Sequence, residues 1–197
     1  MIRKTFFLIP ACAALLFGCS TDLPPSQYLA WMAKNRDALT TAQQQGLIVT
    51  SLAYLPADWL ALNEVGPDHL EQIAATCKQY EGLQYYRLRV ALNSGQGDVL
   101  QFGAGSTDEY YQRVEYFSFG LQNDLHLLAG ADTLPCKLFH FERNYGAAPY
   151  IDFMLGFEEK TDNHFDRTVI YDDRVYSDSL IRLTIPAERI QQIPSLK

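Results

Sequence analysis

The chain has 197 residues, of which 48% are hydrophobic and 20% are charged, a composition typical of a globular protein rather than a disordered or fibrous one. This length is enough for one domain with a hydrophobic core and short for two. The formal net charge of −7, with no basic stripe to offset it, excludes nucleic acid as a favourable partner because phosphate groups would be repelled. Anionic lipid head groups would be repelled too, so attachment to a membrane must have another source.

The first 18 residues have the pattern of a secretory signal peptide. Arg3 and Lys4 give a positive start, and residues 5–17 are almost wholly apolar but too few to span a bilayer, which needs about 20. Residues 16–19 read Leu-Phe-Gly-Cys and resemble the lipobox of bacterial lipoprotein precursors. This resemblance implies cleavage before Cys19 and a membrane anchor made of acyl chains on that cysteine. Removing the two positive charges of the leader from −7 leaves −9 for the mature chain.

Residues 19–25 are expected to form the lipidated cysteine and a short tether, because serine, threonine, aspartate and two prolines give little to pack. Ser20, rather than an aspartate, follows the cysteine and resembles the outer-membrane signal of enteric lipoproteins. Asp22 alone does not make the acidic cluster that directs some lipoproteins to the cell surface. We therefore expect a cell-envelope protein that is anchored in the outer membrane, at its periplasmic face.

Helices and a hairpin are predicted in the first part of the globular domain, which is expected to cover residues 26–197. Ser26 could cap a first helix, and a second is predicted over 57–63, after a proline. The clearest helix follows Gly66, because four residues recur on one face of a 3.6-residue period: Leu70, Ile73, Cys77 and Tyr80. Two extended stretches on either side of Gly46 could form a hairpin: 38–43 and 47–54.

Strands dominate the rest of the chain. Alternation predicts a strand over 86–92, and 99–102 is expected to pair back with it. Ser106 and Glu109 have capping-box spacing for another helix. Five strand-like segments then follow with no helical pattern between them: 125–129, 134–142, 150–158, 167–171 and 180–185. The predicted fold is a single α+β domain, mainly an antiparallel β-sheet with two or three short helices and a C-terminal half that could be sandwich-like.

Cys77 and Cys136 are the other cysteines of the mature chain. Export would place them in an oxidising compartment, where they could form a disulfide. Both also lie in apolar patterns, so they could equally be buried free thiols.

The sequence shows no recognised catalytic or metal-binding motif. The four histidines lack the spacing of metal ligands: His69, His126, His140 and His164. His140 and Glu142 share one strand face, a pattern more typical of structural residues than of a ligand pair. Residues 172–173, both aspartates, are interpreted as part of a solvated turn, because adjacent side chains on an extended chain point apart. We expect no catalytic residue, no metal and no cofactor.

Several segments together resemble small uncharacterised outer-membrane lipoproteins of Bacteroidetes-type bacteria. They are Tyr28-x-x-Trp31, 46–48, 54–58, the run 139–146 after Pro135, and the turn at 171–173. The resemblance covers most of the mature chain. It implies a lipid-anchored envelope protein and assigns no catalytic residue.

Three functions are compatible with these features. The preferred one is a non-enzymatic lipoprotein that binds or supports an unknown envelope protein. Arg143 and Tyr145, at a turn formed by Asn144 and Gly146, are its predicted surface contact, because arginine and tyrosine are favoured at interfaces. A small-molecule or glycan-binding module would use an aromatic face: Tyr85, Tyr110 and Tyr111. An envelope hydrolase would need a pocket beside clustered acid or base groups: His140, Glu142 or Asp172.

Overall fold

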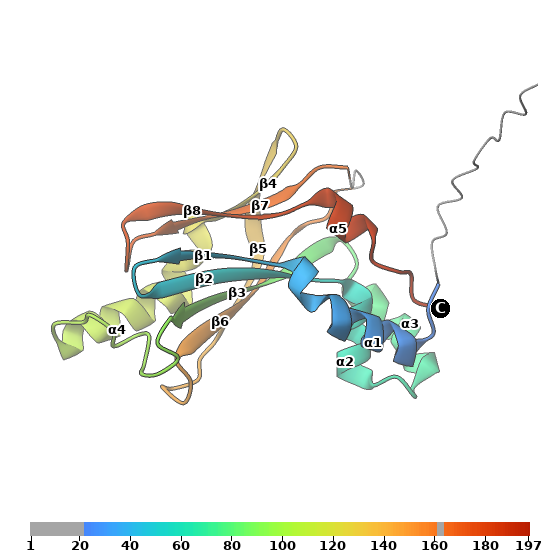
Figure 1. The fold of residues 1–197 in the computed structure, drawn as a ribbon, viewed down its shortest axis with the longest axis horizontal. Helices are drawn as coiled ribbons and strands as arrows, with labels where there is room; N and C mark the ends of the chain where they lie inside the picture. The colour runs from blue at the N-terminus through green and yellow to red at the C-terminus, as the bar shows by residue number, and fades with distance from the viewer. Residues whose placement is uncertain (1–21, 161–163) are drawn as a thin grey trace, which may run out of the picture.

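The fold is built on one antiparallel sheet of eight strands (Figure 1), seen in a computed structural model that describes residues 22–160 and 164–197. The strands follow the order β1-β2-β3-β6-β5-β4-β7-β8. Their bounds are Thr40–Gln45 (β1), Ile48–Leu55 (β2), Leu83–Leu92 (β3), Leu125–Ala129 (β4), Asp132–Glu142 (β5), Tyr150–Glu158 (β6), Arg167–Asp173 (β7) and Ser179–Ile185 (β8). The predicted α+β domain with a mainly antiparallel sheet is confirmed.

The sheet curls until its two end strands meet. Gln45 in β1 donates from Nε2 to the hydroxyl of Ser179 in β8 at 3.0 Å, and Figure 1 shows these strands running side by side. Because β4 pairs with both β5 and β7, the C-terminal strands continue the same sheet instead of forming a separate sandwich layer. β1 and β8 remain the two ends of the hydrogen-bonded strand order.

The main core lies inside the curl. Alternate residues of β3 and β6 point inward and are fully buried: Tyr86, Leu88, Val90, Ile151, Phe153, Leu155 and Phe157. Phe117 and Leu121, from the turns after α4 (Thr107–Glu115), enter the same cluster. The Phe153 ring stacks on Phe141 with centroids 5.0 Å apart and contacts Phe117 at 5.6 Å. Such aromatic contacts add to the gain from burial, so α4 is firmly attached at one side of the sheet.

Three helices gather at the end of the domain away from α4 (Figure 1): α1 (Pro25–Asn35), α2 (Ala57–Val65) and α3 (Leu70–Gln79). A fourth short helix near them, α5 (Ala187–Gln191), precedes the C-terminus. A second cluster of buried side chains holds α1–α3 together: Tyr28, Met32, Leu39, Leu62 and Ile73. The helices thus outnumber the two or three that the sequence predicted. Of the predicted apolar face of α3, Ile73 is buried, whereas Leu70 is 62% exposed.

Two segments differ from the sequence-based predictions. Residues 99–102 form consecutive turns and not a strand, because the Asp98 carboxylate accepts from the Leu100 backbone N–H at 2.9 Å and starts a turn. The predicted tether does not extend to residue 25, since Pro25 already belongs to α1 and Leu23 bridges to Leu196 near the C-terminus. Residues 1–21, including the predicted signal peptide and lipid site at Cys19, lie outside the described residues. Within the described part, no helix is long and apolar enough to cross a bilayer.

Candidate functional site

Two pairs of residues that the sequence assigned to different hypotheses meet at the α4 end of the domain. Arg143 donates from Nη2 to the hydroxyl of Tyr110 at 3.2 Å. Its guanidinium carbon also lies 4.8 Å from the centre of the Tyr145 ring, within the range of a cation–π contact. The Tyr110 and Tyr111 rings meet edge to face with centroids 5.4 Å apart. We call these four residues the Tyr–Arg surface.

The outer members of the Tyr–Arg surface are strongly exposed. Tyr145 is 79% exposed and Tyr111 is 62% exposed, which leaves most of each ring in contact with water. Arg143 is half-buried, and its Nε has no hydrogen-bond partner among the residues that the structure describes. The surface therefore offers two exposed tyrosine rings beside a half-buried positive charge.

The N-terminus of α4 fixes the two tyrosines. The Ser106 hydroxyl accepts from the Glu109 backbone N–H at 3.1 Å, as the capping-box spacing predicted. The Glu109 carboxylate accepts from the Gly105 N–H at 2.8 Å and from Arg113 Nη2 at 2.6 Å. The Gly105 hydrogen bond and the Arg113 charge hold the pKa of Glu109 below its usual value. Tyr110 and Tyr111 therefore occupy a helix turn whose start is held by several bonds.

Buried Arg113 joins the helix to the preceding loop. Its Nη1 donates to the carbonyl of Phe102 at 2.6 Å and to that of Leu100 at 3.3 Å. The buried carbonyls of a loop need partners of this kind, so Arg113 sets the position of the 98–106 loop against α4. No local pattern in the sequence identifies Arg113, because its bonds to Leu100 and Phe102 join segments that are 11 to 13 positions apart.

The turn after β5 presents Tyr145 in an uncommon conformation. Asn144 accepts from the Gly146 N–H at 3.1 Å and donates to the carbonyls of Tyr150 and Ala148, so the predicted Asn–Gly turn is confirmed. Tyr145 has a φ of 53°, in the left-handed region that costs a side chain about 1 kcal/mol. Strained residues of this kind are concentrated at functional sites. An exposed tyrosine held there supports a role for its side chain.

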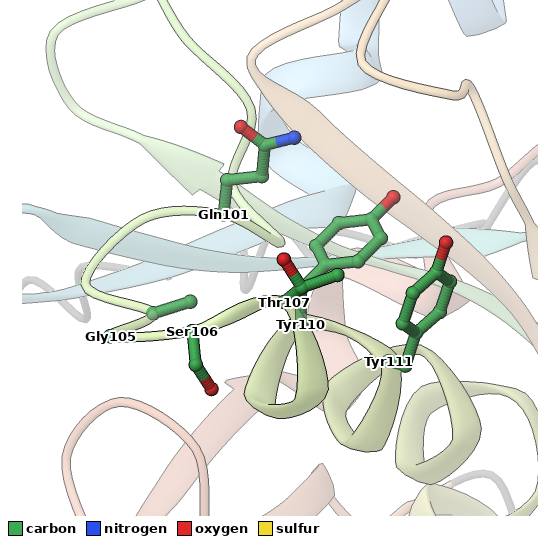
Figure 2. Close-up of a pocket in the computed structure, with 7 residues that line it drawn as sticks. Gln101, Gly105, Ser106, Thr107, Tyr110 and Tyr111 are labelled. Carbon is green, nitrogen blue, oxygen red and sulfur yellow. The ribbon is translucent and has the colours of Figure 1, made fainter.

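A shallow hollow of about 430 Å³ adjoins the two helix tyrosines. Figure 2 shows the Tyr110 and Tyr111 rings next to each other on α4, with the Gln101 side chain on the loop across from them. Ser106 and Thr107 add hydroxyl groups to the lining. The lining thus combines two aromatic rings with hydroxyl, amide and backbone groups.

The remaining aromatic candidate, Tyr85, does not belong to this surface. It is 5% exposed and lies in a small cluster on the outer side of the sheet, where its ring meets that of Tyr80 edge to face at 5.3 Å. Tyr85 is a packing residue, and the predicted aromatic face is reduced to Tyr110 and Tyr111.

The candidate hydrolase residues are not gathered at a pocket. His140 and Glu142 share the outer face of β5, where they lie opposite Met154 and Asp152 of β6. Asp172 accepts from Arg174 Nε at 3.3 Å, in an ionic network that also includes Asp124. In the ranges 22–160 and 164–197, no three His, Cys, Asp or Glu residues come close enough to hold a metal ion.

The second aspartate of the predicted solvated turn is buried. Asp173 is 1% exposed and accepts hydrogen bonds from five donors, which are the hydroxyls of Tyr171 and Ser177 and the backbone N–H groups of Val175, Tyr176 and Ser177. The interpretation of this residue as solvated was wrong. The carboxylate organises the turn between β7 and β8.

Cys77 and Cys136 are free thiols and do not form the disulfide that the sequence left open. Cys136 is buried in the main core and donates from Sγ to the carbonyl of Leu138 at 3.0 Å. Cys77 packs against the α1–α3 cluster, with its Sγ 3.5 Å from Asp58 Oδ1. The two thiols belong to different clusters, which physically explains why they are not bonded and matches the free-thiol alternative.

Comparisons with protein-family models, with curated proteins and with solved structures find no match to this chain.

Proposed function

We propose that the protein is a non-enzymatic lipoprotein of the cell envelope, anchored through acyl chains on Cys19, that binds a protein partner through the Tyr–Arg surface. The observation that carries the binding role is the bridge from Arg143 to both Tyr110 and Tyr145, with Tyr145 largely exposed. Tyrosine and arginine dominate the binding energy of protein interfaces, and here they are preassembled.

The positions of the chain start and of the surface support this role. Leu23, at the start of the described chain, lies beside α1–α3, whereas α4 carries Tyr110 and Tyr111 at the other end of the domain (Figure 1). A lipid anchor just before Leu23 would leave the Tyr–Arg surface directed away from the membrane. The support for the anchor itself is the leader and the lipobox-like residues 16–19. We place the anchor at the periplasmic face of the outer membrane, because Ser20 after the cysteine resembles the outer-membrane signal.

A cross-linking pull-down from detergent-solubilised membranes tests the binding role. The unchanged chain is compared with Arg143→Ala and with Tyr111→Ala/Tyr145→Ala, and Leu180→Ala serves as the control because Leu180 is 56% exposed on β8. We expect one partner with the unchanged chain and the control, and recovery at least about tenfold lower with the other variants. Repeated recovery of the protein alone, or equal recovery with all variants, would contradict the proposal.

A second candidate function is the binding of a glycan in the hollow beside Tyr110 and Tyr111. Its support is the mixture of ring faces and neutral hydrogen-bonding groups, among them the Gln101 amide (Figure 2). Titration with soluble envelope glycans, followed by amide chemical shifts, tests it. Shifts centred on Gln101 and Tyr111 that vanish in Tyr111→Ala would support this function, and an unchanged spectrum would remove it.

A further inference from the structure

A second cavity lies at the other end of the domain, between α1, α2 and the outer face of the β1–β3 strands. Its volume is about 480 Å³, within the range of small-molecule sites. Its apolar walls include six side chains in particular: Leu29, Met32, Leu39, Ala53, Leu55 and Trp59. None of these residues belongs to the Tyr–Arg surface, so this cavity is a separate site.

Two arginines line the same cavity. Arg36 follows the last turn of α1 and is exposed, and Arg87 lies in β3 and is half-buried. Among the ion pairs of the described residues, neither guanidinium has a carboxylate within 4.0 Å. The cavity therefore combines an apolar wall with two positive charges that have no counter-ion bound to them.

The neighbouring acids do not neutralise Arg87. Asp152 is paired with Arg89 instead, which donates two hydrogen bonds to its carboxylate at 2.7 and 2.6 Å. Burial lowers the pKa of Arg87, and the charges of Arg89 and Arg36 lower it further, against the opposite effect of Asp152 and Glu142. A half-buried cation under these conditions would be stabilised by an anion that entered the cavity.

We propose that this cavity binds an amphipathic anion, which is a single apolar chain that ends in a carboxylate or phosphate group. The chain would lie against the six apolar side chains, and the head group would meet Arg36 and Arg87. Guanidinium groups match both head groups well, because their N–H donors are arranged in a planar fork. The inference is independent of the Tyr–Arg surface.

Trp59 makes a direct binding test feasible. It lines the cavity, whereas the other tryptophan of the chain, Trp31, is not among the lining residues. The complete chain is titrated with a long-chain fatty acid that carries bromine along its chain, and quenching of tryptophan fluorescence is followed. Parallel titrations use a brominated lysophosphatidic acid, a brominated fatty alcohol and inorganic phosphate. The variant Trp59→Phe shows whether Trp59 gives the signal. It should remove most of the quenching, whereas calorimetry should still detect binding.

We expect saturable quenching by the fatty acid, the lysophosphatidic acid or both, and the tighter of the two identifies the head group. The alcohol should bind about tenfold more weakly, because it carries no charge, and phosphate alone should not compete. Arg36→Gln and Arg87→Gln should each weaken binding of the anion about tenfold without changing binding of the alcohol. Arg182→Gln, an exposed arginine on β8, is the matched control and should have no effect.

Several results would overturn the proposal. One is equal affinity for the alcohol and the acid, and another is equal loss of affinity in Arg182→Gln. A third is binding that is seen only in Cys19→Ser. Such a result would mean that acyl chains of the protein itself fill the cavity in the unchanged chain. Arg87→Gln could weaken binding only by destabilising the fold, which a lower melting temperature would reveal. In that case the exposed Arg36→Gln is the test, and unchanged affinity in Arg36→Gln contradicts a role for the two charges.

Discussion

Leu23 forms a parallel β-bridge with Leu196, one residue before the C-terminus. The Leu23 N–H donates to the Ser195 carbonyl at 2.9 Å, and the Lys197 N–H donates to the Leu23 carbonyl at 3.0 Å. The described chain therefore enters and leaves the domain at one place, beside α1–α3 (Figure 1). With a lipid on Cys19, four residues earlier, at most about 14 Å of extended chain would separate the anchor from the folded domain.

This bridge predicts that both ends contribute to stability. Leu23→Ala and Leu196→Ala should each lower the free energy of unfolding by about 1 kcal/mol, because each side chain is partly buried in the α1–α3 cluster. Urea denaturation measures the change, with the exposed Leu180→Ala as a control that should stay within about 0.5 kcal/mol of the unchanged chain. Equal stability of all the variants would show that these two side chains do not help to hold the termini.

The buried carboxylate of Asp173 is predicted to contribute more to the free energy of unfolding than Leu23 or Leu196. Asp173→Ala leaves the buried N–H groups of the β7–β8 turn without their acceptor, so the free energy of unfolding should fall by about 3 kcal/mol. The neighbouring Asp172→Ala removes an exposed ion pair with Arg174 and should cost less than about 1 kcal/mol. Thermal or urea unfolding of the two variants gives the comparison, and similar losses would contradict the account.

The two free thiols predict a pH dependence above neutrality. Burial raises the pKa of Cys136 to about 11, and burial together with the Asp58 charge raises that of Cys77 to about 11, from the usual 9.0. The unfolded thiols thus lose their protons first as pH rises, and the folded state binds more protons between pH 9 and 11. The stabilising contribution of the thiols is therefore complete below pH 9 and is lost as pH rises towards 11.

Urea denaturation at a series of pH values checks this window, with Cys136→Ala expected to show a flatter decline above pH 9. Both thiols should also react slowly with iodoacetamide at neutral pH in the native chain and fast after unfolding, because the thiolate is the reactive form. An increase in stability between pH 9 and 11 would contradict the pKa directions, and a mass that changes on reduction would reveal the disulfide that the structure lacks.

Tyr145→Gly separates the contribution of Tyr145 to folding from its contribution to binding. A side chain at a φ of 53° costs about 1 kcal/mol, and glycine removes this cost. Glycine also makes the unfolded chain more flexible, which destabilises the folded state by a similar amount. The free energy of unfolding should therefore stay within about 0.5 kcal/mol of the unchanged chain. Recovery of the partner should fall at least about tenfold, because the exposed ring is lost. Unchanged recovery would exclude Tyr145 from the interface.

The strands could be predicted from the sequence because their signal is local. In β3 and β6 the alternation of inward and outward residues is visible in the chain itself, and both were predicted to within a few residues. Residues 99–102 show the limit of this reasoning. Val99 and Leu100 are apolar because they fill the core from a turn, and no local pattern distinguishes such residues from a short strand.

The members of the candidate site were predicted, but their assembly was not. Tyr110 and Arg143 are 33 positions apart and meet only through the packing of α4 against the sheet. Arg87 lies in the alternating strand that was predicted over 86–92, and nothing in that pattern shows that α1 and α2 would form a cavity beside it. Asp173 was assigned to water because adjacent side chains on an extended chain point apart. The donors that bury its carboxylate come mostly from the β7–β8 turn, and no local pattern shows that this turn closes around it.

The most direct test of the account is the mass spectrum of the amino-terminal peptide of the protein isolated from its own membrane. We predict a peptide that begins at Cys19 and carries a diacylglyceryl group on sulfur and an acyl group on the amino nitrogen, with Cys19→Ala leaving the chain unlipidated. A chain that begins at Met1, or one that begins at an unmodified residue and stays in the soluble fraction, would contradict the proposed anchor and with it the envelope role.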